Sequence, residues 1–325
     1  MTAKPRIIAG SGRSGTTWIL DVLAEVNGLR PVFEPLHPQA IPGAKLYAYK
    51  YIVPGAEAAD LELFFNQYFS GERHSIWTDY RIRSSRLTPQ WRSILSPGRM
   101  YGLFIEWRAA TKRFIHFRRM LGNSPVLVKM IRANLMLGWL RERYDARIVF
   151  VVRHPGAVVE SKVRLGGISW DPEPMLECYR EAAVSGNGLE RYRDLLQEDL
   201  DSVESHTLIW CIENQGPLER AEEQGYLPVF YETLTRDGAN EWDRVIRALD
   251  LDKSPWGSVV IDQPSTQATP ARSMRKHGTG SHWNDRLRGK DLDAIEGVLS
   301  AVGFDVYSAY DPLPRHDFCC ATTSE

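Results

Sequence analysis

The stretch that decides the fold is RIIAGSGRSGTTWILDVLAEV, residues 6–26. An apolar run of strand length, Arg6–Ala9, leads into the glycine- and serine-rich loop Gly10–Thr17. From Thr16 to Val26 the apolar side chains then recur at helical spacing. Glycines let a backbone approach an anion closely, and the first N–H groups of a helix are free to bind it. A strand, a glycine loop and a helix in this order therefore predict an anion-binding turn.

This loop differs from the phosphate loop of nucleotide triphosphatases in two ways. Its spacing is G-x-x-x-x-G-T-T, so Thr16 stands where those proteins carry the Lys that reaches the β- and γ-phosphates. The apolar strand Arg147–Val152 is followed by Arg153, where a triphosphatase would often have a Mg²⁺-binding Asp. Both differences favour a shorter anion that needs no metal; an ordinary Gly/Ser turn is the alternative. The loop residues that we predict to hold the anion are Gly12, Arg13, Ser14, Gly15, Thr16 and Thr17.

Strand and helix patterns alternate along most of the chain. The predicted strands are Arg6–Ala9, Pro31–Phe33, Val126–Lys129, Arg147–Val152 and Leu227–Phe230. After Thr16–Val26, the predicted helices are Glu57–Phe69, Tyr101–Leu121, Leu135–Tyr144, Ala157–Arg164, Glu173–Gln197, Thr207–Gln224, Asn240–Leu249 and Leu292–Val302. This alternation predicts an α/β fold with a central parallel sheet covered by helices on both faces.

The domain organisation is predicted to be simple, because no Pro/Gly/Ser linker and no internal repeat divides the sequence. We expect a single domain over residues 1–311 and a C-terminal tail over 312–325. Residues 38–123, between the second and third strands, are expected to form a helical lobe on the substrate side. The polar stretch 262–284 is expected to be a functional surface loop.

Composition and charge exclude several classes of protein. With 325 residues, 43% of them hydrophobic, the chain can bury a large core. Its 40 Lys and Arg against 41 Asp and Glu give a net charge of −1, which disfavours a nucleic-acid partner. Sparse cysteines without metal-ligand spacing and a start without a signal-peptide core predict a cytoplasmic location. No apolar stretch approaches the roughly 20 residues of a membrane-spanning helix.

A second anion site is predicted after the strand Arg147–Val152. Arg153 follows this strand, and Ser161 lies about two turns into the next helix. Ligands of open α/β sheets bind at the carboxyl ends of strands, and a guanidinium is a planar fork suited to phosphate. Taken alone, this segment favours the alternative that Arg153 pairs with a carboxylate and Ser161 merely packs. Together with the glycine loop, it predicts a nucleotide that carries phosphates at both ends.

These motifs resemble those of the sulfotransferase superfamily, whose donor is 3′-phosphoadenosine 5′-phosphosulfate (PAPS). RSGTTW, residues 13–18, is similar to the family's 5′-phosphosulfate loop, and VVRHPGAVVES, residues 151–161, to its 3′-phosphate motif. FYETL, residues 230–234, and RKHGTGSHW, residues 275–283, are looser matches, because each lacks an acidic residue of the family pattern. The resemblance implies the P-loop-type α/β sulfotransferase fold, PAPS as co-substrate and no metal.

The resemblance also implies roles for individual residues beyond the glycine loop. Arg153, Ser161 and Tyr231 would hold the 3′-phosphoadenosine end of PAPS. Arg275 and Lys276 would do so from the loop 262–284, which closes over the cofactor in the family. One residue is inserted in that loop relative to the family pattern, so these two assignments depend on a shifted alignment.

Sulfuryl transfer to a hydroxyl needs a base for the proton and a cation for charge on the bridging oxygen. We predict Glu34, in Phe33–His37 (FEPLH), as the base, because this segment looks like that of carbohydrate sulfotransferases. The resemblance to tyrosylprotein sulfotransferases implies the same role, since they use a Glu 21 residues after the loop Arg, here Arg13, as base. The alternative is that Glu34 only orients a cation of the phosphate site. His37 is the rival base, although a His beside Pro is more often a turn residue. Lys129, at the end of its strand, is predicted to stabilise the leaving phosphate, unless it simply faces solvent.

The acceptor is predicted less sharply than the donor. The run Arg99–Arg119 interleaves basic and aromatic residues, which is typical of an amphipathic core helix but would also suit an anionic acceptor. Trp77, Tyr80 and Trp91 could stack on sugar rings or belong to the core. The sequence thus predicts transfer from PAPS to a hydroxyl, preferably of a carbohydrate. A P-loop small-molecule kinase and a non-catalytic nucleotide-binding protein are the alternatives, and the oligomeric state stays open.

Overall fold

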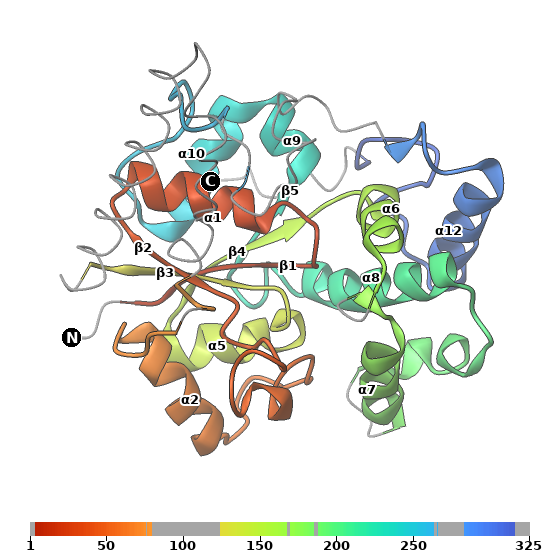
Figure 1. The fold of residues 1–325 in the computed structure, drawn as a ribbon, viewed down its shortest axis with the longest axis horizontal. Helices are drawn as coiled ribbons and strands as arrows, with labels where there is room; N and C mark the ends of the chain where they lie inside the picture. Colours follow the sequence, from red (N-terminus) through yellow and green to blue (C-terminus); the bar gives the residue numbers. More distant parts are fainter. Residues whose placement is uncertain are drawn as a thin grey trace, which may run out of the picture.

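A parallel sheet forms the centre of the protein. The computed structural model describes residues 4–75, 77–79, 124–167, 170–184, 188–262, 265 and 283–315. Within these residues five strands pair in the order β2-β3-β1-β4-β5, all parallel (Figure 1). The strands are β1 Arg6–Gly10, β2 Arg30–Phe33, β3 Val126–Met130, β4 Arg147–Val152 and β5 Leu227–Phe230. The predicted α/β class is confirmed, and each predicted strand agrees within one residue at either end.

Helices cover both faces of the sheet. Those described are α1 Thr16–Val26, α2 Ala59–Phe69, α5 Leu137–Tyr144, α6 Pro155–Leu165, α7 Glu173–Val184, α8 Ser202–Glu219, α9 Tyr231–Arg236, α10 Gly238–Leu249 and α12 Gly289–Ala301, with the short 3₁₀ helices η1 Ala44–Leu46, η3 Asn134–Met136, η5 Glu190–Tyr192 and η6 Leu195–Gln197. Figure 1 shows α1 and α10 on one face and α2 and α5 on the other. Helices α6, α8 and α12 pack against one another on the side toward which β1 and β4 run.

Two hydrophobic cores lie on the two faces, and the strands contribute to both. On β4, Phe150 and Val152 pack into the core with α5 and α8, whereas Val149 and Val151 pack into the core with α1 and α10. A strand buried on both faces has no reason to alternate polar and apolar residues. This explains why Arg147–Val152 is continuously apolar after its first residue.

The sheet order brings the two predicted anion motifs together. β1 pairs with β4 so that Gly10 lies opposite Val151, and the loops that follow both strands begin at neighbouring positions. On its other side, β1 pairs with β3, which places Ile8 opposite Lys129. Open α/β sheets bind ligands in the crevice beyond such strand ends, where the strand order reverses. The fold therefore places most of the predicted site residues at the edge of the sheet where the strands end.

Two predicted helices differ strongly from the structure in their bounds, whereas the other predicted helices that are described differ by a few residues at most. The predicted helix Glu173–Gln197 is wrong: α7 ends at Val184, and two short 3₁₀ turns follow Gly188, whose φ is +76°. Helix α8 begins at Ser202, earlier than predicted, because Asp201 caps it. The Asp201 carboxylate accepts from the Val203 and Glu204 N–H groups, and Glu204 accepts from the Asp201 N–H.

Some predictions fall beyond the described residues. The lobe predicted over 38–123 is described as far as residue 79, where it contains η1 and α2. The predicted helix Tyr101–Leu121, most of the loop 262–284 and the tail after residue 315 lie outside the description. None of the described helices has both the length and the hydrophobicity that a membrane span needs.

Candidate active site

The glycine loop has the strained geometry of a close-fitting turn. A Cβ at Gly10, whose φ is +145°, would lie 2.3 Å from the Val151 carbonyl oxygen, so only glycine lets β1 and β4 run this close together. Arg13 has a φ of +76°, which is unusual for a residue with a side chain. Gly15, at φ +90°, is the N-cap residue directly before α1. The loop thus turns sharply at both ends of its Arg13–Gly15 segment.

The two predicted anion motifs are directly bonded to each other. Arg13 Nε donates to Ser161 Oγ at 3.0 Å, and Arg153 Nη1 donates to the Arg13 carbonyl oxygen at 3.2 Å. Ser161 is buried on α6, and Trp210 Nε1 donates to the Arg153 carbonyl oxygen at 3.0 Å from α8. These bonds join the ends of β1 and β4 into one site. The two motifs therefore lie at the ends of neighbouring strands.

Tyr231 connects the loop to the second motif. A Cβ on Gly15 would lie 2.4 Å from Tyr231 Cε2, so the phenol ring rests on the glycine. The Arg153 guanidinium lies 4.5 Å from the centre of the same ring, in a cation–π contact. The Trp18 ring meets Tyr231 edge-on at 5.9 Å. Tyr231 therefore fixes the position of Arg153 relative to the start of α1.

Buried polar atoms at this site have no partner among the described residues. Ser14 Oγ and Arg153 Nε are both buried and make no hydrogen bond there. In the same part of the chain, no side chain caps the N-terminus of α1, and the first N–H groups of a helix lack intrahelical partners. Unsatisfied buried donors are rare in folded proteins and cost free energy. Their grouping around Gly15 fits a bound anion, and phosphate suits backbone N–H groups and a guanidinium.

The predicted base lies in a buried ion cluster. Lys129 Nζ contacts Glu34 Oε1 at 2.6 Å, and Arg132 Nη1 contacts Glu34 Oε2 at 2.9 Å. The Ile131 N–H also donates to Oε1 at 3.2 Å. Glu34 is 1% exposed, and its φ of +47° turns the chain back after β2. Arg132, which the sequence interpretation missed, lies only three residues beyond Lys129 in VLVKMIR.

Lys129 lies on the α1 face of the sheet, beside the glycine loop. Its ammonium is 4.5 Å from the centre of the Phe33 ring, which belongs to the core with α1. Burial lowers the pKa of Lys129, while the Glu34 carboxylate opposes this shift and Arg13 adds to it. The alternative that this lysine faces solvent is therefore wrong. A desolvated ammonium near both Glu34 and the loop can act on an anion that enters the site.

His37 is poorly suited to act as the base. Burial, reinforced by the positive charge of Arg132, lowers its pKa to about 4. Its Nδ1 accepts from the Ala40 N–H at 3.2 Å, which closes the turn after β2. Its ring lies 4.2 Å from that of Trp77, whose Nε1 donates to the Glu34 carbonyl oxygen at 3.2 Å. His37 is thus a neutral turn residue, and Trp77 supports the backbone of Glu34.

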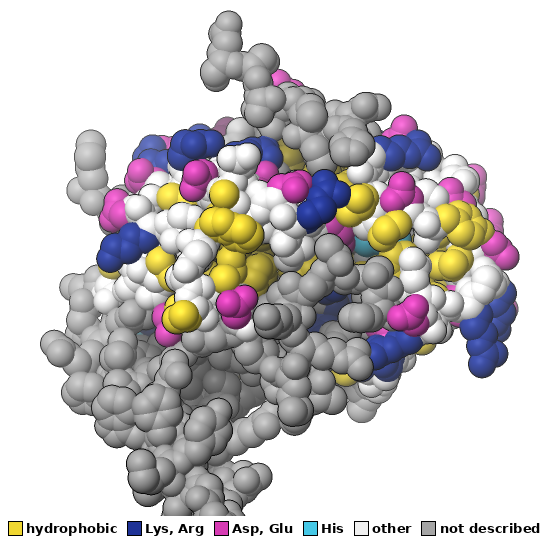
Figure 2. Space-filling model, turned by 90° about the horizontal axis from the view of Figure 1, so that it is seen from above, with side chains coloured by type: hydrophobic (Ala, Val, Ile, Leu, Met, Phe, Trp, Pro, Cys, Tyr) yellow, Lys and Arg dark blue, Asp and Glu magenta, His cyan; other side chains and the backbone are white. Residues whose placement is uncertain are grey.

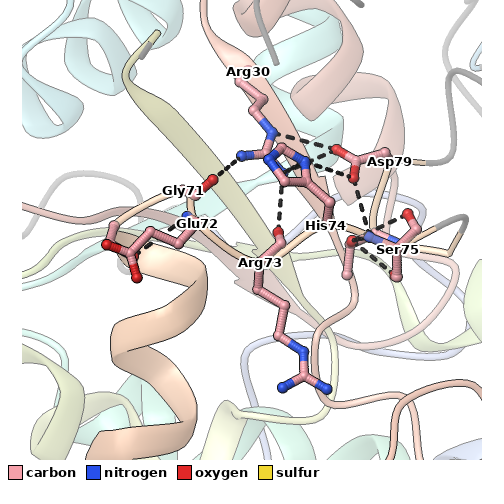
Figure 3. A network of polar contacts seen from close by, with 9 residues as sticks. Arg30, Gly71, Glu72, Arg73, His74, Ser75 and Asp79 are labelled. Carbon is pink, nitrogen blue, oxygen red and sulfur yellow. Dashed lines mark hydrogen bonds and ion pairs between the residues drawn. The ribbon is translucent and has the colours of Figure 1, made fainter. Parts of the chain in front are cut away.

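A polar network anchors the segment that carries Trp77 (Figure 3). Arg30, buried on β2, donates to Asp79 Oδ1 at 3.1 Å and to the Gly71 carbonyl oxygen at 2.5 Å. Asp79 Oδ2 accepts from the Ser75 N–H at 3.2 Å. These bonds fix the segment to the edge of the sheet, so that Trp77 meets the chain just after β2.

Further aromatic and acidic residues brace the second motif, and the sequence interpretation missed their role. His154 Nε2 lies 3.0 Å from the Ser308 carbonyl oxygen and 2.9 Å from that of Asp311, and the ring stacks on Trp283 at 4.1 Å. Burial lowers the pKa of His154 to about 4. Glu232 accepts from the His154 N–H at 3.0 Å. These contacts fix the segment Ser308–Asp311 to the start of α6, beside Arg153.

Two of the predicted cofactor residues, Arg275 and Lys276, lie outside the described residues, as do Tyr80, Trp91 and Arg99–Arg119. Among the residues that are described, no group of three or more His, Cys, Asp and Glu side chains could hold a metal ion. Figure 2 shows acidic and basic side chains interspersed over the described surface of one face, in keeping with the net charge of −1.

A comparison with protein families identifies the family of this chain. The family model described as "Sulfotransferase family" matches residues 5–255. Since this is most of the chain, the protein belongs to the sulfotransferase family. No curated protein matches the sequence.

Three similar solved structures are sulfotransferases or sulfotransferase domains. The domain from the curacin biosynthetic pathway is 12% identical, with a TM-score of 0.43 and coverage of 94% of this chain and 99% of that one. The domain from the Synechococcus PCC 7002 olefin synthase is 18% identical, with a TM-score of 0.42 and coverage of 94% and 98%. Sulfotransferase STF9 from Mycobacterium avium is 15% identical, with a TM-score of 0.41 and coverage of 95% and 79%.

Proposed function

We propose that this sulfotransferase moves the sulfuryl group from PAPS to a hydroxyl of its acceptor. The observation that carries the proposal is the joined anion site, in which Arg13 is bonded to Ser161 and Arg153. Beside the N-terminus of α1, Ser14 Oγ and Arg153 Nε have no partner within the part of the chain that the structure describes. One end suits a 5′-phosphosulfate and the other a 3′-phosphate. A nucleotide with phosphates at both ends satisfies both.

The reaction is an in-line displacement at sulfur. The acceptor oxygen forms a bond to sulfur as the bond to the 5′-phosphate oxygen breaks, which releases adenosine 3′,5′-bisphosphate. The N–H groups at the start of α1 and the hydroxyls of Thr16 and Thr17 stabilise the negative charge on the sulfuryl oxygens. Lys129 stabilises the charge on the leaving phosphate.

Glu34 takes the acceptor's proton in this mechanism. In the structure, Lys129, Arg132 and the Ile131 N–H donate to its carboxylate. A carboxylate has about four lone-pair positions, so few are free. We propose that Lys129 turns from Glu34 Oε1 to the bridging oxygen when PAPS binds. This movement would free Oε1 for the acceptor hydroxyl, while Arg132 keeps the carboxylate in place.

A carbohydrate acceptor is supported by the EPL sequence at Glu34–Leu36, and a cytoplasmic location by the free thiols of Cys178 and Cys211. The test is transfer of radiolabelled sulfate from PAPS to a panel of sugars, phenols and alcohols. Binding of adenosine 3′,5′-bisphosphate without metal is measured beside binding of ATP–Mg²⁺. Labelled product and metal-independent binding are expected. Tighter binding of ATP–Mg²⁺ would support the kinase, and binding without transfer a non-catalytic protein.

A further inference from the structure

Lys162 and Glu213 form a buried pair that the proposed reaction does not use. Lys162 lies on α6, next to Ser161, and Glu213 lies on α8; their side chains are 2% and 4% exposed. Lys162 Nζ is 4.0 Å from Glu213 Oε2, which is too far for a hydrogen bond. Among the described residues Glu213 Oε2 has no hydrogen-bond partner at all. By contrast, the buried pair of Lys129 and Glu34 closes to 2.6 Å.

The 4.0 Å separation of Lys162 and Glu213 is costly for two buried charges. Burial lowers the pKa of Lys162 and raises that of Glu213, and each partner counteracts the shift of the other. Buried charges are tolerated when hydrogen bonds satisfy them. Tyr179 donates to Glu213 Oε1, but the ammonium of Lys162 and Glu213 Oε2 do not reach each other. A small polar group between the two would satisfy both. Only a group that accepts from the ammonium and donates to the carboxylate fits, and a hydroxyl does both.

This pair lies beside the phosphate loop. The Ser11 hydroxyl lies against the Glu213 carboxylate, where it works to lower the pKa of Glu213. Asn214, the next residue of α8, donates from Nδ2 to Ser11 Oγ at 2.7 Å, and its own Oδ1 is buried without a partner among the described residues. Glu213 Oε2 and Asn214 Oδ1 thus lie close to Ser11, at the start of the glycine loop.

A second path links the pair to Glu34. Tyr179 donates to Glu213 Oε1 at 3.4 Å, and its ring meets that of Tyr49 edge-on at 6.3 Å. Arg132 Nε donates to the Tyr49 hydroxyl at 2.8 Å, and the same guanidinium binds Glu34. The polar side chains therefore follow one another from the proposed base to the buried pair. A molecule with one hydroxyl at Glu34 could present another along this path.

We propose that Lys162 and Glu213 bind a second hydroxyl of the acceptor, so that the acceptor is a polyhydroxylated compound such as a sugar. This inference rests on the proposed function, because it assumes that an acceptor enters beside Glu34. The pair selects the acceptor and takes no part in the bond changes at sulfur.

The first experiment needs no acceptor. Thermal unfolding is compared for wild type, Glu213→Leu, and the double variant Lys162→Met/Glu213→Leu. Glu213→Leu leaves a buried ammonium unpaired and should unfold several degrees below wild type. The double variant should return to the wild-type midpoint or exceed it, since a functional pair contributes nothing to folding. A double variant that is less stable than Glu213→Leu would show a structural pair and overturn the proposal.

The second experiment measures selection. Transfer from PAPS is followed with methyl glucopyranoside and its monodeoxy analogues, for wild type and Glu213→Gln. In wild type, one deoxy analogue should keep the site of sulfation yet lose about ten- to a hundredfold in kcat/KM, the effect of losing a hydrogen bond to charged groups. For Glu213→Gln, the loss in kcat/KM between the parent glucoside and that analogue should be smaller than for wild type. The exposed pair Lys50–Glu181, 3.8 Å apart, provides the control variant Glu181→Gln, which should behave as wild type.

The outcomes separate this inference from the function on which it rests. The loss in kcat/KM caused by Glu213→Gln and the loss caused by the deoxy analogue can be compared with the loss when both are combined. If the two losses are additive, the gap between the side chains holds only an ordered water, and the proposal is overturned. The same follows if the protein binds adenosine 3′,5′-bisphosphate and sulfates phenols or simple alcohols but none of the glucosides. A protein that binds no adenosine 3′,5′-bisphosphate would instead contradict the proposed function.

Discussion

Removing the Glu34 carboxylate should destabilise the fold as well as stop the reaction. The Glu34, Lys129 and Arg132 side chains are 1%, 5% and 10% exposed, so Glu34→Ala would leave two buried cations without their shared partner. Breaking a buried pair in this way costs about 3–5 kcal/mol. Lys129 can lose its proton, because burial already lowers its pKa, and Arg132 keeps its bond to the Tyr49 hydroxyl. We therefore expect the lower end, about 3 kcal/mol.

The assay is unfolding of the nucleotide-free protein at pH 7. With an unfolding entropy of about 2.1 cal/mol/K per residue, a loss of about 3 kcal/mol lowers the midpoint of this 325-residue chain by roughly 4–5 °C. Lys129→Met should also destabilise, and the double variant Glu34→Ala/Lys129→Met should lose less than the sum of the two. Glu219→Ala is the control, because it breaks an exposed pair with Arg191 that is worth at most about 1 kcal/mol. A Glu34→Ala protein within a degree of wild type, or strictly additive losses, would refute the buried cluster.

Kinetics of the base require a milder change at the same position. Glu34→Gln keeps the size of the side chain and one oxygen that can accept from a cation. Loss of a general base should lower kcat by about 10²–10⁴-fold. The affinity for adenosine 3′,5′-bisphosphate should not fall, since among the described residues Glu34 makes no bond to Arg153, Ser161 or the glycine loop, and its loss of charge releases Lys129 for the 5′-phosphate. A variant with wild-type turnover would remove Glu34 as the base.

Three further predictions test the rest of the site. Arg153→Ala should weaken binding of adenosine 3′,5′-bisphosphate by about 1.5–3 kcal/mol in calorimetry, the worth of hydrogen bonds to a charged group; unchanged affinity would exclude Arg153. Gly15→Ala should weaken nucleotide binding because its Cβ displaces Tyr231, whereas Gly28→Ala, at φ +67° with open space around it, should alter only stability; equal affinities would contradict this contact. His154 binds a proton near pH 6.5 when unfolded but near pH 4 when folded, so its contribution is complete above about 6.5 and is lost as the pH falls toward 4. Urea unfolding between pH 7 and 5 should show a shallower loss for His154→Gln than for wild type, and equal slopes would be evidence against a neutral buried His154.

The sequence predicted the sheet and the anion motifs because both depend on local patterns. Continuous apolar runs such as Arg147–Val152 mark strands buried on both faces, and the glycine loop is defined by its own spacing. The helix after Glu173 was extended too far because its periodicity outweighed the chain-breaking run Ser185–Gly188 (SGNG). The early start of α8 was readable from Asp201 and Glu204, whose spacing is that of a capping box.

Long-range partners could not be predicted in the same way. Arg132 reaches Glu34 only because β3 lies next to β2, a neighbour relation that no local pattern contains. The gap between Lys162 and Glu213 likewise depends on how α6 packs on α8. Such long-range partners can be identified only from the three-dimensional structure. A Lys in the middle of an otherwise apolar helix face is nevertheless a sequence feature that indicates a buried partner.

The most direct test of the central claim is a crystal structure with adenosine 3′,5′-bisphosphate. The account predicts the 5′-phosphate at the N–H groups of Ser14–Thr17 and the 3′-phosphate within hydrogen-bonding distance of Arg153 and Ser161. Ser14 Oγ and Arg153 Nε should then have partners. A nucleotide bound elsewhere, or a crevice filled by the protein's own side chains at saturating nucleotide, would contradict it.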